Sequence, residues 1–150
     1  MTDFVVREAT IEEILALRKA VLRPEEPVEP SDYDATPQIR HVGAFAGAEC
    51  IGCATVFPSP YADPAGEHCP EAWQLRGMAV APERRGTGVG RRVLDEAVAV
   101  MRAARAPLCW ANARAAALPF YMKAGWRRVG EEFRYGPARL PHYVIVRTFD

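Results

Sequence analysis

The spacing of apolar and polar residues predicts the first helix of the chain and the strands around it. Apolar side chains recur at helical spacing over residues 11–22, directly after Thr10, and Glu13 lies three positions beyond that threonine. A threonine followed three residues later by glutamate forms a capping box, so an amphipathic helix should begin there. Pro24 ends the pattern, because proline lacks the backbone N–H that a helix needs. The strands predicted in this part of the chain are 4–7, 41–46 and 50–57.

A second group of elements follows from the pattern in the rest of the chain. Residues 73–80 form an apolar stretch typical of a buried strand. Residues 89–104 place valine, alanine and methionine side chains on one side of a helix. The other predicted elements are a strand at 108–112, a short helix at 115–123, and strands at 126–133 and 143–149.

The resulting order, β-α-β-β-β-α-β-α-β-β, predicts the fold class. Three consecutive strands in its middle argue against a sheet built only from parallel βαβ units. We therefore expect an α/β fold of the α+β type, with one mixed, mostly antiparallel sheet flanked by helices. Residues 1–150 show no internal repeat, and 150 residues suit a single domain. Two proline-rich segments, 24–37 and 58–70, should be irregular.

Composition and charge narrow the class of protein. Basic and acidic residues number 19 each, so the formal net charge is +0 and no excess of positive charge points to nucleic acid. No apolar run reaches the length of a membrane span. The N-terminal residues lack the basic and apolar regions of a signal peptide, which predicts a cytoplasmic location. In that compartment the four cysteines should be free thiols.

One cysteine pair has the spacing of a metal or redox motif. Cys50 and Cys53 form a C-x-x-C, and His68 and Cys69 follow downstream. Residues three apart in a strand point to opposite faces of the sheet, and no second pair of this kind completes a ligand set. We therefore predict no metal site and interpret the cysteines as small buried apolar residues.

The most informative segment is the glycine-rich stretch 84–90, Arg-Arg-Gly-Thr-Gly-Val-Gly, between a predicted strand and a predicted helix. Glycine has no Cβ, so the backbone can turn tightly and direct consecutive N–H groups inward. The start of the helix adds unpaired N–H groups and the positive end of its dipole. Together these features predict an anion site suited to phosphate or pyrophosphate.

Two common classes of phosphate loop fit this segment poorly. A P-loop closes with Gly-Lys-Ser/Thr, whereas Gly90 is followed by Arg91 and Arg92. A dinucleotide fingerprint has the spacing G-x-G-x-x-G inside a βαβ unit, with an acidic residue at the end of the next strand. This chain has G-x-G-x-G after a predicted hairpin and lacks that acidic residue.

The loop and its surroundings resemble the acetyl-CoA site of the GNAT family of N-acetyltransferases. Arg85, Gly88 and Gly90 match the family's pyrophosphate loop, directly after a strand that ends in Met-Ala-Val. Residues 108–129 resemble the family's second conserved block, a strand and a short helix with the pattern Phe-Tyr-x-x-x-Gly-Trp. The resemblance covers nearly the whole chain and implies the acyl-CoA N-acyltransferase fold.

The resemblance also implies where acetyl-CoA binds. Its pyrophosphate would lie on the N–H groups of residues 85–90, and its pantetheine arm would pair with the strand backbone at Met78 and Val80, as an added strand would. Asn112 stands where the family often has a polar residue on that arm, although a turn at the strand end explains it nearly as well. The residues implied to bind the coenzyme are Met78, Ala79, Val80, Arg85, Gly86, Thr87, Gly88, Val89, Gly90 and Asn112.

Tyr121 is the one residue to which the resemblance gives a chemical role. It aligns with a family tyrosine whose hydroxyl faces the coenzyme sulfur, which implies a general acid for the leaving thiolate. On spacing alone it would be an ordinary core tyrosine. No motif marks the base. The candidates for it are His142, Glu71, Arg76 and His41.

The implied function is transfer of an acetyl group from acetyl-CoA to a primary amine, on a small molecule or a peptide. Residues 24–40 and 58–72 would form the acceptor side, and neither carries a readable motif. Glu25, Glu26 and Glu29 would attract a cationic amine or form a solvated loop. Pairing of edge strands into a homodimer is compatible with the family. The alternative functions are a non-catalytic acyl-CoA sensor and a nucleotide-binding protein.

Overall fold

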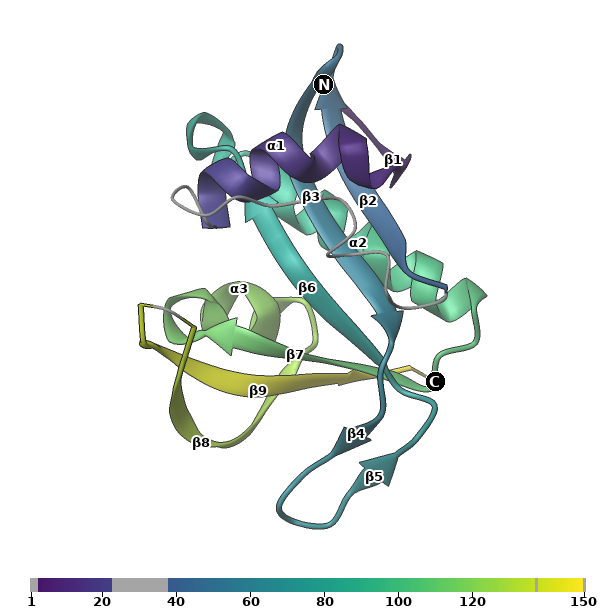
Figure 1. The fold of residues 1–150 in the computed structure, drawn as a ribbon, viewed down its shortest axis with the longest axis vertical. Coiled ribbons are helices and arrows are strands. Elements are labelled where there is room, and N and C mark those ends of the chain that lie inside the picture. The colour runs from purple at the N-terminus through teal and green to yellow at the C-terminus, as the bar shows by residue number, and fades with distance from the viewer. Residues whose placement is uncertain (1–2, 23–37, 137, 150) are drawn as a thin grey trace.

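The computed structural model describes residues 3–22, 38–136 and 138–149, which form a seven-stranded sheet with helices on both faces (Figure 1). The strand order is β1-β2-β3-β6-β7-β9-β8, and β4 pairs with β5 in a separate ribbon. The strands are β1 (Val5–Ala9), β2 (Arg40–Ala46), β3 (Glu49–Pro58), β4 (Tyr61–Ala62), β5 (His68–Cys69), β6 (Trp73–Val80), β7 (Leu108–Arg114), β8 (Arg127–Tyr135) and β9 (Leu140–Thr148). The helices are α1 (Ile11–Leu22), α2 (Val89–Ala103) and α3 (Leu118–Lys123), with 3₁₀ turns η2 (Pro82–Arg84) and η3 (Ala115–Ala117).

The sheet is mixed and mostly antiparallel, which confirms the predicted fold class. Neighbouring strands in it run antiparallel except β6 and β7. These two share only the registered pairs Trp73 with Cys109 and Gln74 with Trp110. Beyond the second pair the strands separate, and Figure 1 shows the angle that opens between them.

α1 begins where the capping box predicts. The backbone N–H of Thr10 donates to Glu13 Oε1 over 2.9 Å, and the N–H of Glu13 donates to Thr10 Oγ1 over 3.3 Å. Two N–H groups that the helix cannot pair itself are satisfied in this way. Arg7 Nη2 of β1 donates to Glu13 Oε2 over 2.6 Å, which joins the start of the helix to the sheet.

Replacing Glu13 with glutamine is expected to lower stability slightly at neutral pH and to have a progressively smaller effect as the pH falls toward and below 2. The Arg7 guanidinium and then the Thr10 N–H lower the pKa of Glu13 from 4.5 to about 2. A carboxylate with a depressed pKa stabilises the fold above its unfolded pKa, and this contribution is lost as the pH falls through the folded pKa. The measurement is the urea midpoint of both proteins across this range. A difference that does not shrink toward acid would contradict a role of the Glu13 charge.

α2 packs its predicted apolar side against the sheet. Val89, Val93, Ala97 and Met101 are all buried. Gly52 of β3 permits the close approach, because a Cβ there would lie 2.7 Å from Val89 Cγ1. α1 covers the opposite side of the sheet, against β3 and β6 (Figure 1). We call these two sides the α2 face and the α1 face.

Several predicted boundaries were wrong. The segment 58–70, predicted to be irregular, contains β4 and β5, whose two residues each are too few to show an apolar period. β9 begins at Leu140 rather than at residue 143, since it continues to pair with β8 past the register shift between Val129 and Phe133. The short helix predicted at 115–123 is divided into η3 and α3.

All four cysteines are free thiols. Cys53 is buried on β3, and burial raises the pKa of its thiol to about 12. Within residues 3–22, 38–136 and 138–149, no three histidine, cysteine or acidic side chains gather as a metal site would require. The same ranges contain no helix of the length and apolarity needed to span a bilayer. The predictions for residues 24–37, including Glu25, Glu26 and Glu29, lie outside these ranges.

Candidate active site

A cleft of about 1010 Å³ occupies the space where β6 and β7 separate. β6 is bulged there, because its register with β3 shifts between Cys53 and Thr55. Gly77 has a φ of +63°, a left-handed conformation that glycine adopts without strain. A bulge bends its strand, which turns β6 away from β7. β6, β7, the ends of α1 and α3, and the turn between β8 and β9 form the walls.

Register assigns the cleft residues of β6 to two faces. Arg76 lies opposite Thr55 in the antiparallel ladder, so both side chains share one face. That face is the α1 face, because Arg18 Nη1 of α1 donates to Thr55 Oγ1 over 2.9 Å. Beyond the bulge, Met78 and Val80 pack instead into the core under α2. The half of β6 before the bulge therefore presents a charged side chain to the α1 face of the cleft. The half beyond the bulge presents apolar side chains to the α2 face.

The cleft residues of β7 and β9 follow from the same reasoning. Gln74 lies two positions before Arg76 on β6, so the two side chains share one face. Gln74 is also registered with Trp110 of β7. Alternation along β7 then places Asn112 and Arg114 on the α1 face. His142 of β9 joins them, because it pairs with Arg114. All three line the cleft, and the half-buried Asn112 side chain makes no hydrogen bond to any residue in the described ranges.

The loop between η2 and α2 presents unpaired backbone donors. Gly86 and Gly88 have φ angles of +78° and +92°, and a Cβ on either would meet no atom within 4 Å. Among residues 85–90, the N–H groups without an acceptor in the described part of the chain are those of Gly86, Gly88, Val89 and Gly90. The N–H groups of Arg85 and Thr87, in contrast, donate over 3.3 Å to carbonyls of η2. Unpaired donors beside open space at a helix start fit a phosphate or pyrophosphate.

Among the arginines near this loop, Arg85 is the one directed to the cleft. The others contact other side chains: Arg84 pairs with Asp3, Arg91 pairs with Asp95, and Arg92 lies over the ring of Phe4. Arg85 is exposed, lines the cleft, and has no ion pair with a residue that the structure describes. Its charge is therefore available to an anion bound at the loop.

Val80 lies where β6, α2 and α3 meet. A Cβ on Gly90 would lie 3.3 Å from Val80 Cγ2 and 3.5 Å from Phe120 Cε1, so glycine allows the three elements to approach. The Ala81 N–H donates to Ile51 O of β3 over 2.9 Å. Backbone groups alternate in direction along such a ladder, so the N–H and C=O of Val80 point away from β3, toward the cleft. This strand edge can pair with an extended ligand.

Tyr121 of α3 lines the cleft from the α2 face. Its ring centroid lies 5.1 Å from that of Phe120 and 5.6 Å from that of Trp126. Burial and, secondly, the Cys109 thiol raise the pKa of the Tyr121 hydroxyl well above its ordinary value. The hydroxyl therefore stays protonated at neutral pH. It donates no hydrogen bond within the described ranges, so a ligand in the cleft can accept one from it.

Three residues predicted to contact the coenzyme direct their side chains elsewhere. Ala79 is buried in a cluster with Ile14 of α1, on the other face. The Val89 side chain is buried in the core, although its N–H belongs to the loop. The Thr87 hydroxyl donates to the Arg84 carbonyl. These residues shape the backbone rather than offering side chains to a ligand.

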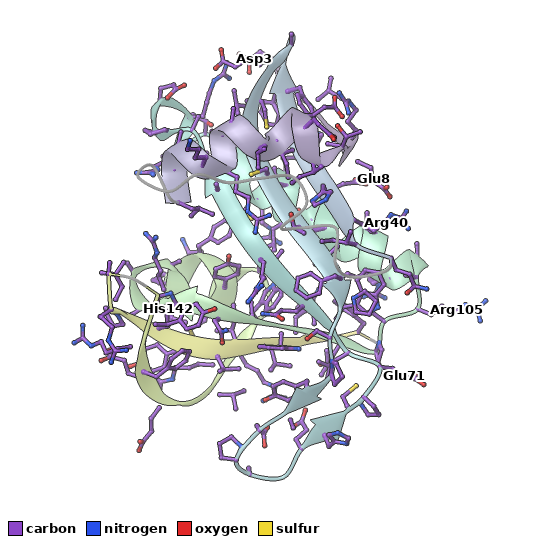
Figure 2. All side chains as sticks on the ribbon, viewed as in Figure 1. Asp3, Glu8, Arg40, Glu71, Arg105 and His142 are labelled. Atoms are coloured by element: carbon purple, nitrogen blue, oxygen red, sulfur yellow. The ribbon has the colours of Figure 1, made fainter. Side chains whose placement is uncertain are left out.

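Of the four candidate bases, His142 and Arg76 line the cleft. His41 is buried on β2, and Glu71 is exposed between β5 and β6. Figure 2 shows Glu71 and His142 on opposite sides of the molecule. An arginine keeps its proton, which leaves His142 as the candidate base in the cleft.

The buried His142 ring has a defined orientation. Its Nδ1 lies 2.8 Å from Leu140 O, and the rings of Phe133 and Tyr135 contact it at 6.0 and 5.2 Å between centroids and also contact each other. A carbonyl oxygen only accepts hydrogen bonds, so Nδ1 carries the proton. In the neutral ring, Nε2 then has a free lone pair and can accept a proton.

The sequence did not reveal a buried polar chain under the bulge. Arg18 Nη1 and His41 Nδ1 lie 2.9 and 2.8 Å from Thr55 Oγ1. A Cβ on Gly77 would collide with the Arg18 guanidinium, so glycine makes room for it. The signal was present, since Arg18 stands at a position of α1 where the helical period of Ile11 and Ile14 expects an apolar residue.

The sequence matches the model of the acetyltransferase (GNAT) family over residues 9–126, which include β6, the loop, α2 and α3. The chain belongs to the GNAT family. It is therefore an acetyl-CoA-dependent N-acetyltransferase, as the motifs predicted. It is 28% identical over 145 residues to YitI, an uncharacterized N-acetyltransferase of Bacillus subtilis, and the match covers 95% of each chain.

Solved structures of GNAT proteins share the fold. Escherichia coli ElaA superposes with a TM-score of 0.75 at 19% identity, over 96% of this chain and 99% of that one. A GNAT acetyltransferase of Elizabethkingia anophelis, solved with acetyl-CoA bound, superposes with a TM-score of 0.72 at 13% identity, over 99% and 100% of the two chains. These likenesses confirm the predicted acyl-CoA N-acyltransferase fold.

Proposed function

We propose that this acetyltransferase acts on a primary amine, which attacks the thioester of acetyl-CoA directly in the cleft between β6 and β7. The observation that carries the proposal is the two-sided lining of the cleft. The loop, Val80 and Tyr121 line the α2 face, whereas Arg76 and His142 line the α1 face. The coenzyme approaches from the first side and the amine from the second, so the reactants meet where the strands separate.

Acetyl-CoA supplies an activated acetyl group, two phosphate groups that bridge its halves, and an extended amide-containing arm. The free N–H groups at Gly86 and Gly88, the first amides of α2 and the Arg85 guanidinium hold the pyrophosphate. The cleft edge of β6 at Met78 and Val80 pairs with the amides of the arm. Four of the six N–H groups of residues 85–90 are available to bind the anion. The other two, those of residues 85 and 87, already donate to carbonyls of η2.

Two side chains of the protein, those of His142 and Tyr121, transfer the two protons that the reaction moves. The amine nitrogen forms a bond to the carbonyl carbon and the carbon–sulfur bond breaks. His142 Nε2 receives the proton that the amine nitrogen loses and passes it to solvent. The Tyr121 hydroxyl donates to the departing sulfur, and solvent restores its proton. Its burial keeps it in the protonated form that this role requires.

Thiol release from acetyl-CoA is the test of this proposal, measured with wild type and His142→Gln against amines, amino acids, polyamines and peptides. We expect at least one amine to stimulate release above hydrolysis and to yield an acetylated product by mass spectrometry. His142→Gln should lower kcat/KM at least tenfold, the scale of general-base catalysis. If acetyl-CoA raises the melting temperature but no amine is acetylated, the proposed acceptor class is wrong. An unchanged kcat/KM in His142→Gln would exclude that base.

A further inference from the structure

The α1 face of the cleft is lined with positive charge from three elements. The charged residues lining the cleft are Arg18 and Lys19 of α1, Arg76 of β6, Arg114 of β7 and, at the loop, Arg85. No aspartate or glutamate in the described ranges lines it. An acceptor that approaches from the α1 face therefore meets cations on both strands and on the helix above them.

Arg76 and Arg114 stand on opposite walls of the cleft. Arg76 lies two residues beyond the last registered pair of β6 and β7, and Arg114 lies four residues beyond it. Both side chains are exposed, and neither forms an ion pair with a residue that the structure describes. Arg76 Cζ lies 5.8 Å from the ring centroid of Phe57, which supports the guanidinium without neutralising it.

Arg18 adds a fixed positive group at the bulge between them. Its guanidinium is buried, bonded to Thr55 and packed against Gly77. A buried side chain held in this way keeps its position while a ligand binds. Arg18 thus fixes one guanidinium at the bulge, and the two exposed arginines, Arg76 and Arg114, are free to adapt to a ligand.

We propose that the acceptor amine carries an oxyanion, a carboxylate as in an amino acid or a phosphate as in an aminoalkyl phosphate, and that Arg76 and Arg114 bind it. This inference rests on the proposed function. Guanidinium groups bind oxyanions with paired, charge-assisted hydrogen bonds. The same cations disfavour the ammonium form of the nearby amine and so favour the neutral form that attacks. An acceptor whose only charges are positive, of the kind that Glu25, Glu26 and Glu29 would attract, would meet like charges here.

The test compares amines that differ only in the anion: phenylalanine with phenethylamine, lysine with cadaverine, and phosphoethanolamine with ethanolamine. We expect wild type to prefer the anionic partner by at least about tenfold in kcat/KM, the scale of one hydrogen bond to a charged group. Arg76→Gln and Arg114→Gln should lose most of this preference through a higher KM for the anionic partner. Arg76→Lys should retain part of it.

Arg105→Gln is the matched control. Arg105 is exposed in the turn between α2 and β7, does not line the cleft, and lies far from His142 (Figure 2). It should keep the wild-type preference, and melting curves establish that each variant is folded. Equal or higher kcat/KM for the amines without an anion would overturn this inference and leave the proposed function intact. If no amine is acetylated, the proposed function fails and this inference fails with it.

Discussion

Tyr121→Phe should lower kcat at least tenfold and leave the affinity for acetyl-CoA nearly unchanged. Removal of a general acid costs about a hundredfold or more in well-studied enzymes, so tenfold is a conservative bound. The ring stays in place, because it packs against Phe120 and Trp126 and its hydroxyl has no protein partner in the described ranges. The variant therefore removes the proposed donor to the sulfur and little else.

Two further measurements make this result specific. Burial keeps the pKa of Tyr121 far above neutral, so loss of the hydroxyl should lower kcat equally across the pH range and not remove a limb of the profile. Tyr143→Phe is the control, since Tyr143 is half-buried on β9, lies under Arg128 and does not line the cleft. Unchanged turnover in Tyr121→Phe would show that Tyr121 is only a core residue.

The coenzyme side could be predicted from the sequence because its parts are neighbours along the chain. The strand ending at Val80, the loop and the start of α2 are consecutive, and their glycines mark the turn directly. The capping box at Thr10 was equally local. Signals of this kind depend on short-range sterics and hydrogen bonding, which a single sequence contains.

The proposed acceptor side could be predicted only in part, because four elements distant in sequence build it. Arg18, Arg76, Arg114 and His142 meet only after β6 and β7 take neighbouring places in the sheet. That neighbourhood depends on long-range pairing, and the bulge at Gly77 depends on the volume of a buried guanidinium. Neither leaves an apolar period in the sequence, so Arg76 and His142 were named only among other candidates. The assignment of the acceptor side to segments 24–40 and 58–72 stays a prediction, because residues 24–37 lie outside the described ranges.

Gly88→Ala is expected to weaken acetyl-CoA binding at least about tenfold, the scale of one charge-assisted hydrogen bond. Gly88 caps α2 with φ +92° and ψ −3°, and its N–H has no acceptor in the described part of the chain. An alanine there adds a Cβ to the open space that the pyrophosphate would occupy. It also costs about 1–2 kcal/mol in left-handed strain, so the melting temperature should fall by roughly 2–8 °C.

Gly66→Ala separates strain from binding. Gly66 has a φ of +98°, and a Cβ there also meets nothing within 4 Å, but the residue lies in the turn between β4 and β5. It should lose similar stability and keep the full rise in melting temperature that acetyl-CoA produces. If Gly88→Ala shows that full rise as well, the pyrophosphate does not lie at this loop.

S-acetylpantetheine tests whether the loop at Gly88 binds the pyrophosphate, because it has the same thioester and arm as acetyl-CoA but no phosphate. Wild type should use it poorly, and Gly88→Ala should use it about as well as wild type, since the altered amide has no anion to bind. Tyr121→Phe should be impaired with both donors, because the role proposed for its hydroxyl is at the sulfur. A loss in Gly88→Ala that is equally large for S-acetylpantetheine would mean that the substitution distorts β6 or α3 instead. Two donors and two variants thereby distinguish anion binding at the start of α2 from chemistry at α3.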